Sequence, residues 1–298
     1  MNQVSLGRRG LLGGTIGLMA LVAAIAAPAA LANSTANGNA IDADLRGMVP
    51  AVTLVGQGNV QFETGLGLTK DGADAHLLRA WTTPTIMRFG MPNYEIRVQS
   101  DAYSHIRTLG AVNAGMSDLM IGLKGVAPPL LDPRLSVAVL AQAWFPNGAS
   151  QIKHNGVRPE IQLVGQWQLP SNTAISGVAG VRSDVDVEDA RYATGMLGLN
   201  LAHGWTPRIN TFAELAAREI RTAARGGKNL MWDVGAAWRA LPATQLNARV
   251  GWGIKENDTD LAWRIGVSTR FRPPDLGAMT HKHDSKEDQP QSASDNDR

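Results

Sequence analysis

The sequence contains no cysteine among its 298 residues. This absence excludes disulfide frameworks, thiolate zinc sites, cysteine nucleophiles and lipoprotein attachment. After residue 32, no apolar run approaches the ~20 residues that a membrane-spanning helix needs, so a helical membrane protein is also excluded. Charged residues are scarce at 18%, whereas glycine is abundant at 32 residues. This composition favours one large barrel over two average soluble domains.

The charge balance excludes nucleic acid as a partner. The first 32 residues carry Arg8 and Arg9 and no acidic residue. Without those two arginines, 26 of the 28 basic residues remain, against 26 acidic residues. A net charge of zero is not the electrostatic footprint of a nucleic-acid-binding protein.

The first 32 residues have the pattern of a secretory signal peptide. The arginine pair precedes an apolar stretch at 11–31, and the small residues Ala30 and Ala32 predict cleavage after residue 32. Glycines and a proline within the stretch disfavour an uncleaved membrane anchor. The arginine pair matches a twin-arginine signal only weakly. We expect the general secretory route, because a chain bound for a second membrane must travel unfolded.

From residue 58 to residue 271 the sequence alternates with a period of two, which predicts strands with one apolar face. In the last segment, Trp263, Ile265 and Val267 alternate with Arg264, Gly266 and Ser268. The polar face consists mostly of Gly, Asn, Gln, Ser and single charges, whereas a soluble sandwich carries many Lys and Glu. This face suits a narrow lumen.

Twelve such segments can be counted, and most are about ten residues long, enough to cross a bilayer when tilted. They cover residues 58–68, 77–90, 94–103, 117–126, 135–145, 158–169, 173–182, 191–203, 208–218, 229–239, 245–254 and 260–271. Tight turns at 91–93, 170–172, 204–207 and 240–244 alternate with longer loops at 69–76, 104–116, 146–157, 183–190 and 219–228, and a short one at 255–259. The even count and the alternation predict an all-β fold, a closed antiparallel outer-membrane barrel. The expected organisation is a signal peptide (1–32), a polar lead (33–57), the barrel (58–271) and a disordered polar tail (272–298).

Aromatic residues cluster near the predicted strand ends. The group at the tight-turn end is Phe89, Tyr94, Trp167, Trp205, Trp238 and Phe271. The group at the long-loop end is Tyr103, Trp144, Phe145, Tyr192, Trp232, Trp252 and Trp263. Aromatic residues can end strands in any β protein, but two such bands are typical of a barrel among lipid and lipopolysaccharide. We therefore expect the protein in the cell outer membrane.

The last strand resembles the C-terminal β-signal that the barrel-assembly machinery recognises. A polar residue, Arg264, is followed two residues later by Gly266 and five residues after that by Phe271. Such signals usually end the chain, whereas 27 residues follow here. The machinery is an expected partner.

Several short elements resemble the outer-membrane transporter family of meta-pathway phenol-degradation proteins. They are QFETG at 61–65, MRFG at 87–90, EIR at 95–97, GMSDLMIGLK at 115–124 and FPNG at 145–148. Their order and spacing match across about 58–271, and the SDLMIGLK element is the most specific. The resemblance implies a twelve-stranded barrel that takes up small, often hydrophobic or aromatic compounds.

No pattern predicts catalysis, a metal site or a cofactor. His76, His105 and His154 lie in predicted loops near acids or hydroxyls, but none has a recognised catalytic spacing. His203 falls at a strand end, and a tail group of His281, His283 and Asp284 is expected to be solvated. The acidic stretch 183–189 is either solvated or a calcium site, and both alternatives stay open.

Fourteen ionisable residues are expected to face the lumen. They are Glu63, Arg88, Glu95, Arg97, Asp101, Asp118, Lys124, Glu160, Arg182, Glu214, Asp233, Arg249, Arg264 and Arg270. Isolated charges inside the wall would be costly, so they must pair or line water. They either stiffen the wall as a ladder of ion pairs or form a polar conduit that orients a passing solute.

The sequence thus favours passive uptake of small, possibly hydrophobic or aromatic molecules, without enzymatic activity. Two alternatives stay open: an outer-membrane lipid-modifying enzyme and a non-conducting structural barrel. The identity of the solute, the state of the pore and the oligomeric state are not specified by the sequence.

Overall fold

The computed structural model describes residues 41–71, 78–108, 111–128, 132–222, 224, 227–254 and 260–273. The predicted signal peptide with Ala30 and Ala32, the loop histidine His76 and the tail from residue 274 with His281, His283 and Asp284 lie outside the described residues. Within the described ranges, no helix combines the length and the apolar character needed to cross a membrane.

The described chain is almost entirely β-structure, with one short 3-10 helix, η1 (Asp44–Arg46). The strands are β1 (Val60–Asp71), β2 (Leu78–Gly90), β3 (Tyr94–Thr108), β4 (Ala111–Gly115), β5 (Leu119–Val126), β6 (Leu135–Phe145), β7 (Arg158–Leu169), β8 (Thr173–Val185), β9 (Arg191–Gly204), β10 (Ile209–Ile220), β11 (Lys228–Leu241), β12 (Thr244–Gly253) and β13 (Leu261–Phe271).

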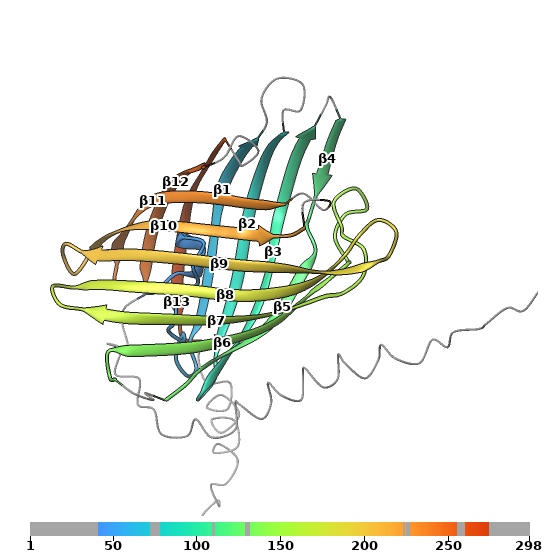
Figure 1. Cartoon of the computed structure of the whole chain (residues 1–298). Helices are drawn as coiled ribbons and strands as arrows, with labels where there is room; N and C mark the ends of the chain where they lie inside the picture. The colour runs from blue at the N-terminus through green and yellow to red at the C-terminus, as the bar shows by residue number, and fades with distance from the viewer. Residues whose placement is uncertain are drawn as a thin grey trace, which may run out of the picture.

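These strands form one antiparallel sheet that closes on itself (Figure 1). Apart from β4 and β5, each strand pairs with its neighbours in sequence, and β1 pairs with both β2 and β13. The short β4 and β5 both pair with β3, so the thirteen described strands occupy twelve positions in the ring. The fold is therefore the predicted twelve-stranded closed barrel.

The barrel buries polar side chains and exposes apolar ones, which is the reverse of the distribution in a soluble protein. Large aliphatic side chains face outward, and Leu197, Leu199 and Leu201 of β9 are more than half exposed at 55%, 57% and 51%. Between them, the side chain of Asn200 is buried. Because successive strand residues point to opposite faces, this alternation puts apolar groups on the outside and polar groups inside.

Most predicted strand bounds differ from the observed ones by three residues or fewer, but one predicted loop is wrong. Residues 104–116 were expected to be a loop that includes His105; instead β3 continues to Thr108 and β4 pairs back against it. The strand ladder is interrupted only at 116–118, where the Ser117 hydroxyl accepts a hydrogen bond from the Asp101 amide (2.8 Å). A ladder can extend past the apolar band because its backbone hydrogen bonds do not require an apolar face.

The aromatic bands are largely on the outer surface. Trp167, Trp205 and Trp238 are exposed near the tight-turn end, and Trp232 is exposed near the long-loop end. One exception is Trp144, whose indole N–H donates to a Glu160 carboxylate oxygen (3.2 Å). Trp144 therefore points inward, because the inward phase of β6 includes residues 138, 140, 142 and 144.

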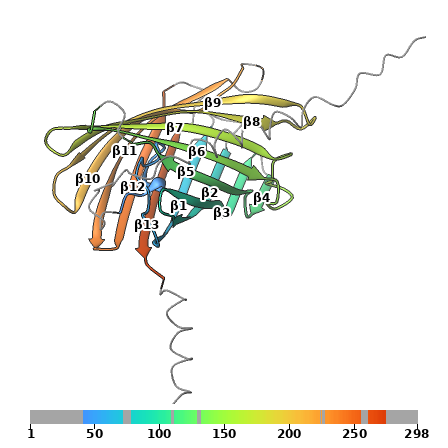
Figure 2. The same cartoon turned by 90° about the horizontal axis from the view of Figure 1, so that it is seen from below.

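Residues 41–57, named here the inner segment, lie inside the ring of strands (Figures 1 and 2). The segment includes η1 and leads directly into β1. Most of its apolar side chains are buried, among them Ile41, Val49, Val52 and Val55. The sequence predicted these residues only as part of a polar lead, so the inner segment is the main feature that the sequence did not indicate.

Candidate functional site

The ionisable residues expected in the lumen occupy the barrel strands and the interruption between β4 and β5. Ten are buried: Glu63, Arg88, Glu95, Arg97, Asp118, Lys124, Glu160, Glu214, Asp233 and Arg249. Four are partly exposed: Asp101, Arg182, Arg264 and Arg270. They form three groups, of which the first surrounds the inner segment.

Near the tight-turn end, the strand register brings like charges together. Arg88 of β2 lies directly opposite Arg97 of β3. Lys124 of β5 lies opposite Glu95, and Glu63 approaches from β1. Like charges opposite each other destabilise a sheet. The wall alone therefore presents three cations and two carboxylates.

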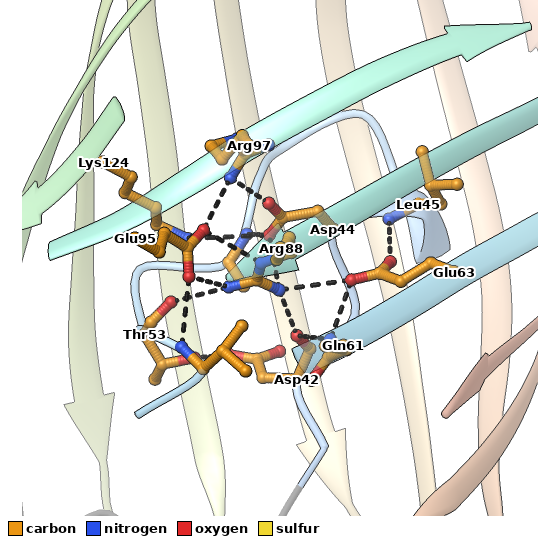
Figure 3. Close-up of polar contacts among 12 residues, drawn as sticks. Asp42, Asp44, Leu45, Thr53, Gln61, Glu63, Arg88, Glu95, Arg97 and Lys124 are labelled. Atoms are coloured by element: carbon orange, nitrogen blue, oxygen red, sulfur yellow. Dashed lines mark hydrogen bonds and ion pairs between the residues drawn. The ribbon is translucent and has the colours of Figure 1, made fainter. Parts of the chain in front are cut away.

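The inner segment supplies the third carboxylate, from Asp44 (Figure 3). Its oxygens lie 3.5 Å from the Arg88 guanidinium and 3.7 Å from the Lys124 ammonium, and one accepts a hydrogen bond from Arg97. Burial alone would raise the pKa of Asp44, but the three cations lower that pKa well below its ordinary value. Asp44 is therefore ionised and balances the surplus positive charge.

Arg88 is at the centre of this first group. Its Nε and Nη2 atoms bind both carboxylate oxygens of Glu95 at 2.9 Å each. Its Nη1 donates to Glu63 (3.2 Å) and to the Asp42 carbonyl (2.9 Å), and Nη2 also donates to the Thr53 carbonyl (3.0 Å). A buried ion pair is stabilising only when hydrogen bonds compensate the desolvation of both ions. Here strand carboxylates and carbonyls of the inner segment provide that compensation together.

Strand carboxylates also accept hydrogen bonds from the backbone of the inner segment. The contacts are Leu45 N to Glu63 (2.9 Å), Met48 N to Glu214 (2.6 Å), Val49 N to Glu214 (3.3 Å) and Val55 N to Glu95 (3.1 Å). Charge-assisted hydrogen bonds are about twice as strong as neutral ones. Because the donors are main-chain groups, these contacts depend on the path of the inner segment more than on its side chains.

Apolar contacts also hold the inner segment in its position inside the barrel. Val49 and Val52 pack in a buried cluster with inward-facing residues of β6, β7 and β8, namely Ala138, Leu140, Val164 and Val178. Met48 joins a second buried cluster with Ala216, Met231 and Ala262. The inner segment therefore contacts both the charged and the apolar parts of the wall.

Two glycines allow the segment to pass close to the wall. A Cβ atom at Gly47 would overlap the Glu214 carboxylate, and one at Gly90 would overlap the Gly56 carbonyl oxygen. Only glycine permits such close approach of a backbone.

The second group lies at the long-loop end and organises residues 146–157. The buried Asp118 accepts hydrogen bonds from the amides of Gly148 (3.2 Å) and His154 (3.0 Å) and from Arg158 (3.1 Å). His154 Nδ1 lies 3.2 Å from the same carboxylate. Burial and the neighbouring Arg158 lower the pKa of His154 and outweigh the opposite effect of Asp118.

This group does not have the composition of a hydrolase site. Among the described residues, the hydrogen bonds of His154 go to Asp118 and not to a serine or threonine hydroxyl. His203 lies far away at the end of β9, 2.8 Å from the Thr173 hydroxyl. The described residues also bring together no group of three His, Cys, Asp or Glu side chains that could hold a metal ion.

The acidic stretch 183–189 has its first two carboxylates engaged within the protein. Asp184 binds Arg182 (2.8 and 3.1 Å) and accepts a hydrogen bond from the Thr194 hydroxyl (2.5 Å). Asp186 accepts the amides of Glu188 (3.1 Å) and Ala190 (2.8 Å) and so closes a turn. The stretch acts here as a strand end and a turn.

The third group lies on β10 to β13. Arg249 donates to the buried Asp233 (2.7 Å) and lies directly opposite Arg264 in the register of β12 and β13. Arg270, on the same strand as Arg264, donates twice to Gln61 (3.0 and 2.7 Å) near the tight-turn end. The two arginines of β13 therefore differ in how well they are paired.

Some participants were not expected from the sequence. Asp42, Asp44 and Thr53 belong to the inner segment, and Arg158 and Asp184 join the second group. Arg158 and Asp184 could have been found by extending the period of two, since they continue the inward phase of Glu160 and Arg182. The inner segment has no such period, but its aliphatic residues between 41 and 55 were a signal that it is buried.

The fold matches solved outer-membrane proteins. The COG4313 outer membrane channel from Pseudomonas putida F1 has a TM-score of 0.57 and 12% identity over 78% of this chain and 100% of that chain. The NanC porin has a TM-score of 0.49 and 13% identity over 70% of this chain and 98% of that chain. No curated protein sequence matches the chain.

A family model matches residues 35–271, a range that includes the whole inner segment as well as every described strand. The family is described as "Putative MetA-pathway of phenol degradation". This match agrees with the resemblance carried by the short elements between residues 61 and 148. With its closed barrel and charged interior, the chain belongs to this family of outer-membrane β-barrels.

Proposed function

We propose that this protein is a passive channel for small molecules, with hydrophobic or aromatic compounds among its solutes. The observation that carries the proposal is the distribution of side chains: the closed barrel is apolar outside and lined inside by ionisable groups from most of its strands. Charged groups inside a barrel suit a water-filled path, and their opposed signs orient a solute. The fold of the P. putida outer membrane channel supports the same function.

The inner segment makes the resting channel narrow. Its polar contacts are hydrogen bonds and ion pairs to strand side chains, which water or a solute can replace, and its apolar contacts are two small clusters around Val49, Val52 and Met48. We propose that conduction requires a shift of residues 41–57 within the barrel. A barrel that never conducts would need the same segment to be immobile.

We also infer export to the outer membrane through a signal peptide cleaved after Ala32, with assembly by the barrel-assembly machinery among lipid and lipopolysaccharide. N-terminal sequencing of the protein from outer-membrane fractions should then begin at Asn33. Retention of residues 1–20 would contradict this. Assembly should depend on Phe271 and not on residues 273–298.

Solute flux into proteoliposomes tests the channel. We expect the full mature chain to admit small aromatic and hydrophilic solutes faster than protein-free liposomes, at a rate linear in concentration. Absence of flux for every solute, in a folded barrel and also in the Asp44→Ala variant, would overturn the proposal in favour of a structural barrel. Release of fatty acid from the liposome lipid would instead indicate a lipid-modifying enzyme.

A further inference from the structure

Two arginines lie face to face in the barrel interior without enough partners. Arg249 of β12 and Arg264 of β13 are directly opposite in the antiparallel register. Arg249 is buried, and Arg264 is partly exposed to the lumen. Like charges in this position repel unless an anion lies between them.

The described contacts satisfy only part of this pair. Arg249 binds Asp233, and Arg264 donates one hydrogen bond to the Leu45 carbonyl (3.3 Å). The Nε atoms of both guanidinium groups are buried and have no hydrogen-bond partner among the described residues. A buried donor without an acceptor costs about 1–3 kcal/mol, so each arginine retains capacity for an anion.

The surrounding charges leave this site positive. The charged neighbours of Arg264 are Arg249, Arg218, Asp101 and Asp233, so three cations face two carboxylates. Glu214 also lies near Arg249. Its carboxylate, however, is already bound by the Met48 and Val49 amides and by Asn200.

Elsewhere in the barrel, a carboxylate compensates the repulsion between two directly opposed arginines. Arg88 and Arg97 are also directly opposite, and the Asp44 carboxylate lies within ion-pair distance of both. No described carboxylate makes an ion pair with both Arg249 and Arg264. A carboxylate is thus the group that the second pair is suited to bind.

A buried apolar cluster adjoins the arginine pair. Ala216, Met231 and Ala262 each occupy the next inward position beyond Glu214, Asp233 and Arg264, toward the long-loop end, and Met48 packs with them. A site that combines a few charged groups with an apolar wall is typical of small organic ligands. The ligand should therefore carry an apolar body as well as an anionic group.

The pair lies further toward the long loops than the first group, at the level of Leu45 and Met48 of the inner segment. In the register of β1 and β13, Glu63 lies opposite Ser268 and Gly67 lies opposite Arg264. Arg264 is thus four residues, about 13 Å, beyond the level of Glu63 toward the long loops. The Leu45 carbonyl touches its guanidinium from the inner segment.

We propose that Arg249 and Arg264, with the exposed Arg218 beside them, bind the carboxylate of a small organic acid whose apolar body packs toward Met231 and Ala262. This inference rests on the proposed channel function, because it names the class of solute that would pause in the lumen. A neutral phenolic or alcoholic solute would lack the group that the arginine pair binds.

Equilibrium binding of benzoate to the full mature chain in detergent tests the proposal by calorimetry, with benzyl alcohol as a neutral probe of similar size. We expect benzoate to bind at least about tenfold more tightly than benzyl alcohol, since hydrogen bonds to charged groups exceed neutral ones. Equal binding of the two probes, or no binding of benzoate, would overturn the proposal. This comparison uses the wild-type protein and requires no variant to fold.

Two substitutions on the same strand locate the site. Arg264→Gln should weaken benzoate binding by about tenfold or more, and Arg264→Lys should restore part of it. Arg270→Gln is the matched control, because it removes the same charge from the same face of β13 at a guanidinium already bound by Gln61. Equal losses in Arg264→Gln and Arg270→Gln would overturn the assignment and indicate a general effect of net charge.

Binding and flux together separate this inference from the proposed function. Benzoate binding without flux of any solute would support the site and overturn the channel. Flux of neutral aromatic solutes without benzoate binding would support the channel and overturn the site.

Discussion

Two pairs of opposed arginines lie in the same barrel, and they differ in what lies between them. Between Arg88 and Arg97, the protein places its own carboxylate, Asp44, on a segment that arrives from outside the strand order. Between Arg249 and Arg264 it places none, and Asp233 binds only one of the two. Folding supplies the first pair with a shared carboxylate, although the Nε atom of Arg97 has no hydrogen-bond partner among the described residues. The second is left with unused donors where the lumen is accessible.

The difference teaches how one interior can hold a chain segment firmly and still bind a solute. At the first pair, every cation of the wall is matched by a carboxylate, so the inner segment is part of the folded core. At the second pair, the wall keeps a surplus positive charge beside an apolar surface. A structural role and a functional role for interior charge are thus separated along the barrel axis.

The largest effect is expected from breaking the first pair. Asp44→Ala leaves Arg88, Arg97 and Lys124 buried with one carboxylate too few, and removing one partner of a buried ion pair costs about 3–5 kcal/mol. We expect the inner segment to leave its position inside the barrel. This release should raise the single-channel conductance and allow protease cleavage within 41–57.

The control for this experiment is Asp42→Ala. In the described part of the chain, the Asp42 carboxylate binds only to residues of the inner segment, namely Arg46 (3.4 Å) and the Thr53 hydroxyl (3.0 Å). Conductance and cleavage should stay close to those of the wild type. If both variants open the channel equally, the charge balance at Arg88 and Arg97 is not what holds the segment.

The role of the second pair can be tested further by removing the one carboxylate that binds it, that of Asp233. Asp233→Asn frees Arg249 and should tighten benzoate binding, by about tenfold if it restores one charge-assisted hydrogen bond to the ligand. Calorimetry measures the change. Weaker binding in Asp233→Asn would mean that Asp233 orients Arg249 instead of competing with the ligand.

A smaller effect is expected from Glu214→Gln, which removes the charge and keeps an acceptor oxygen for only one of the Met48 and Val49 amides, because these amides bind different oxygens of Glu214. The loss should be about 1–2 kcal/mol in the free energy of releasing the inner segment, measured by the denaturant dependence of its protease cleavage. Glu160→Gln is the matched control, since Glu160 is a buried carboxylate that does not contact residues 41–57 in any described hydrogen bond. Equal changes in both variants would contradict a specific role of Glu214.

The smallest effect is expected from mild acid. Because the folded pKa of Asp44 lies well below its ordinary value, its stabilising contribution is complete above about pH 4 and is lost only as the pH falls further. Conductance at pH 5 should therefore equal that at pH 8. A channel that opens between these values would show that another group controls the inner segment.

The barrel could be predicted from the sequence because its pattern is local. Alternation of outward residues such as Trp263 and Ile265 with inward ones such as Arg264 follows from strand geometry alone, and it identified the strands. The same rule could not extend to 104–116, where a strand pair continues without an apolar outer face. Trp144 was grouped with the outer aromatics by its place at a strand end, although the alternation along β6 makes its position inward.

Of the candidate site, only the residues on strands could be predicted from the sequence. Arg88, Glu95 and Arg97 were expected in the lumen, but their partner Asp44 lies on an irregular segment without periodicity. Its position depends on contacts between residues far apart in sequence, such as Met48 with Glu214. The incomplete pairing of Arg249 and Arg264 likewise depends on the register of β12 and β13, which no single segment specifies.

The place of the inner segment beside the barrel seam has a consequence for the order of folding. The seam joins β1 to β13. Two hydrogen bonds bridge it, Gln61–Arg270 and Leu45–Arg264, and their partners are 209 and 219 positions apart in the sequence. Contacts of such separation carry the largest loop-closure cost and form late. Glu63 and Arg264, on the two sides of the seam, both bind Leu45. The inner segment therefore connects the two strands that pair last, and a chain that closes without it would have a seam held by backbone pairing and the Gln61–Arg270 contact.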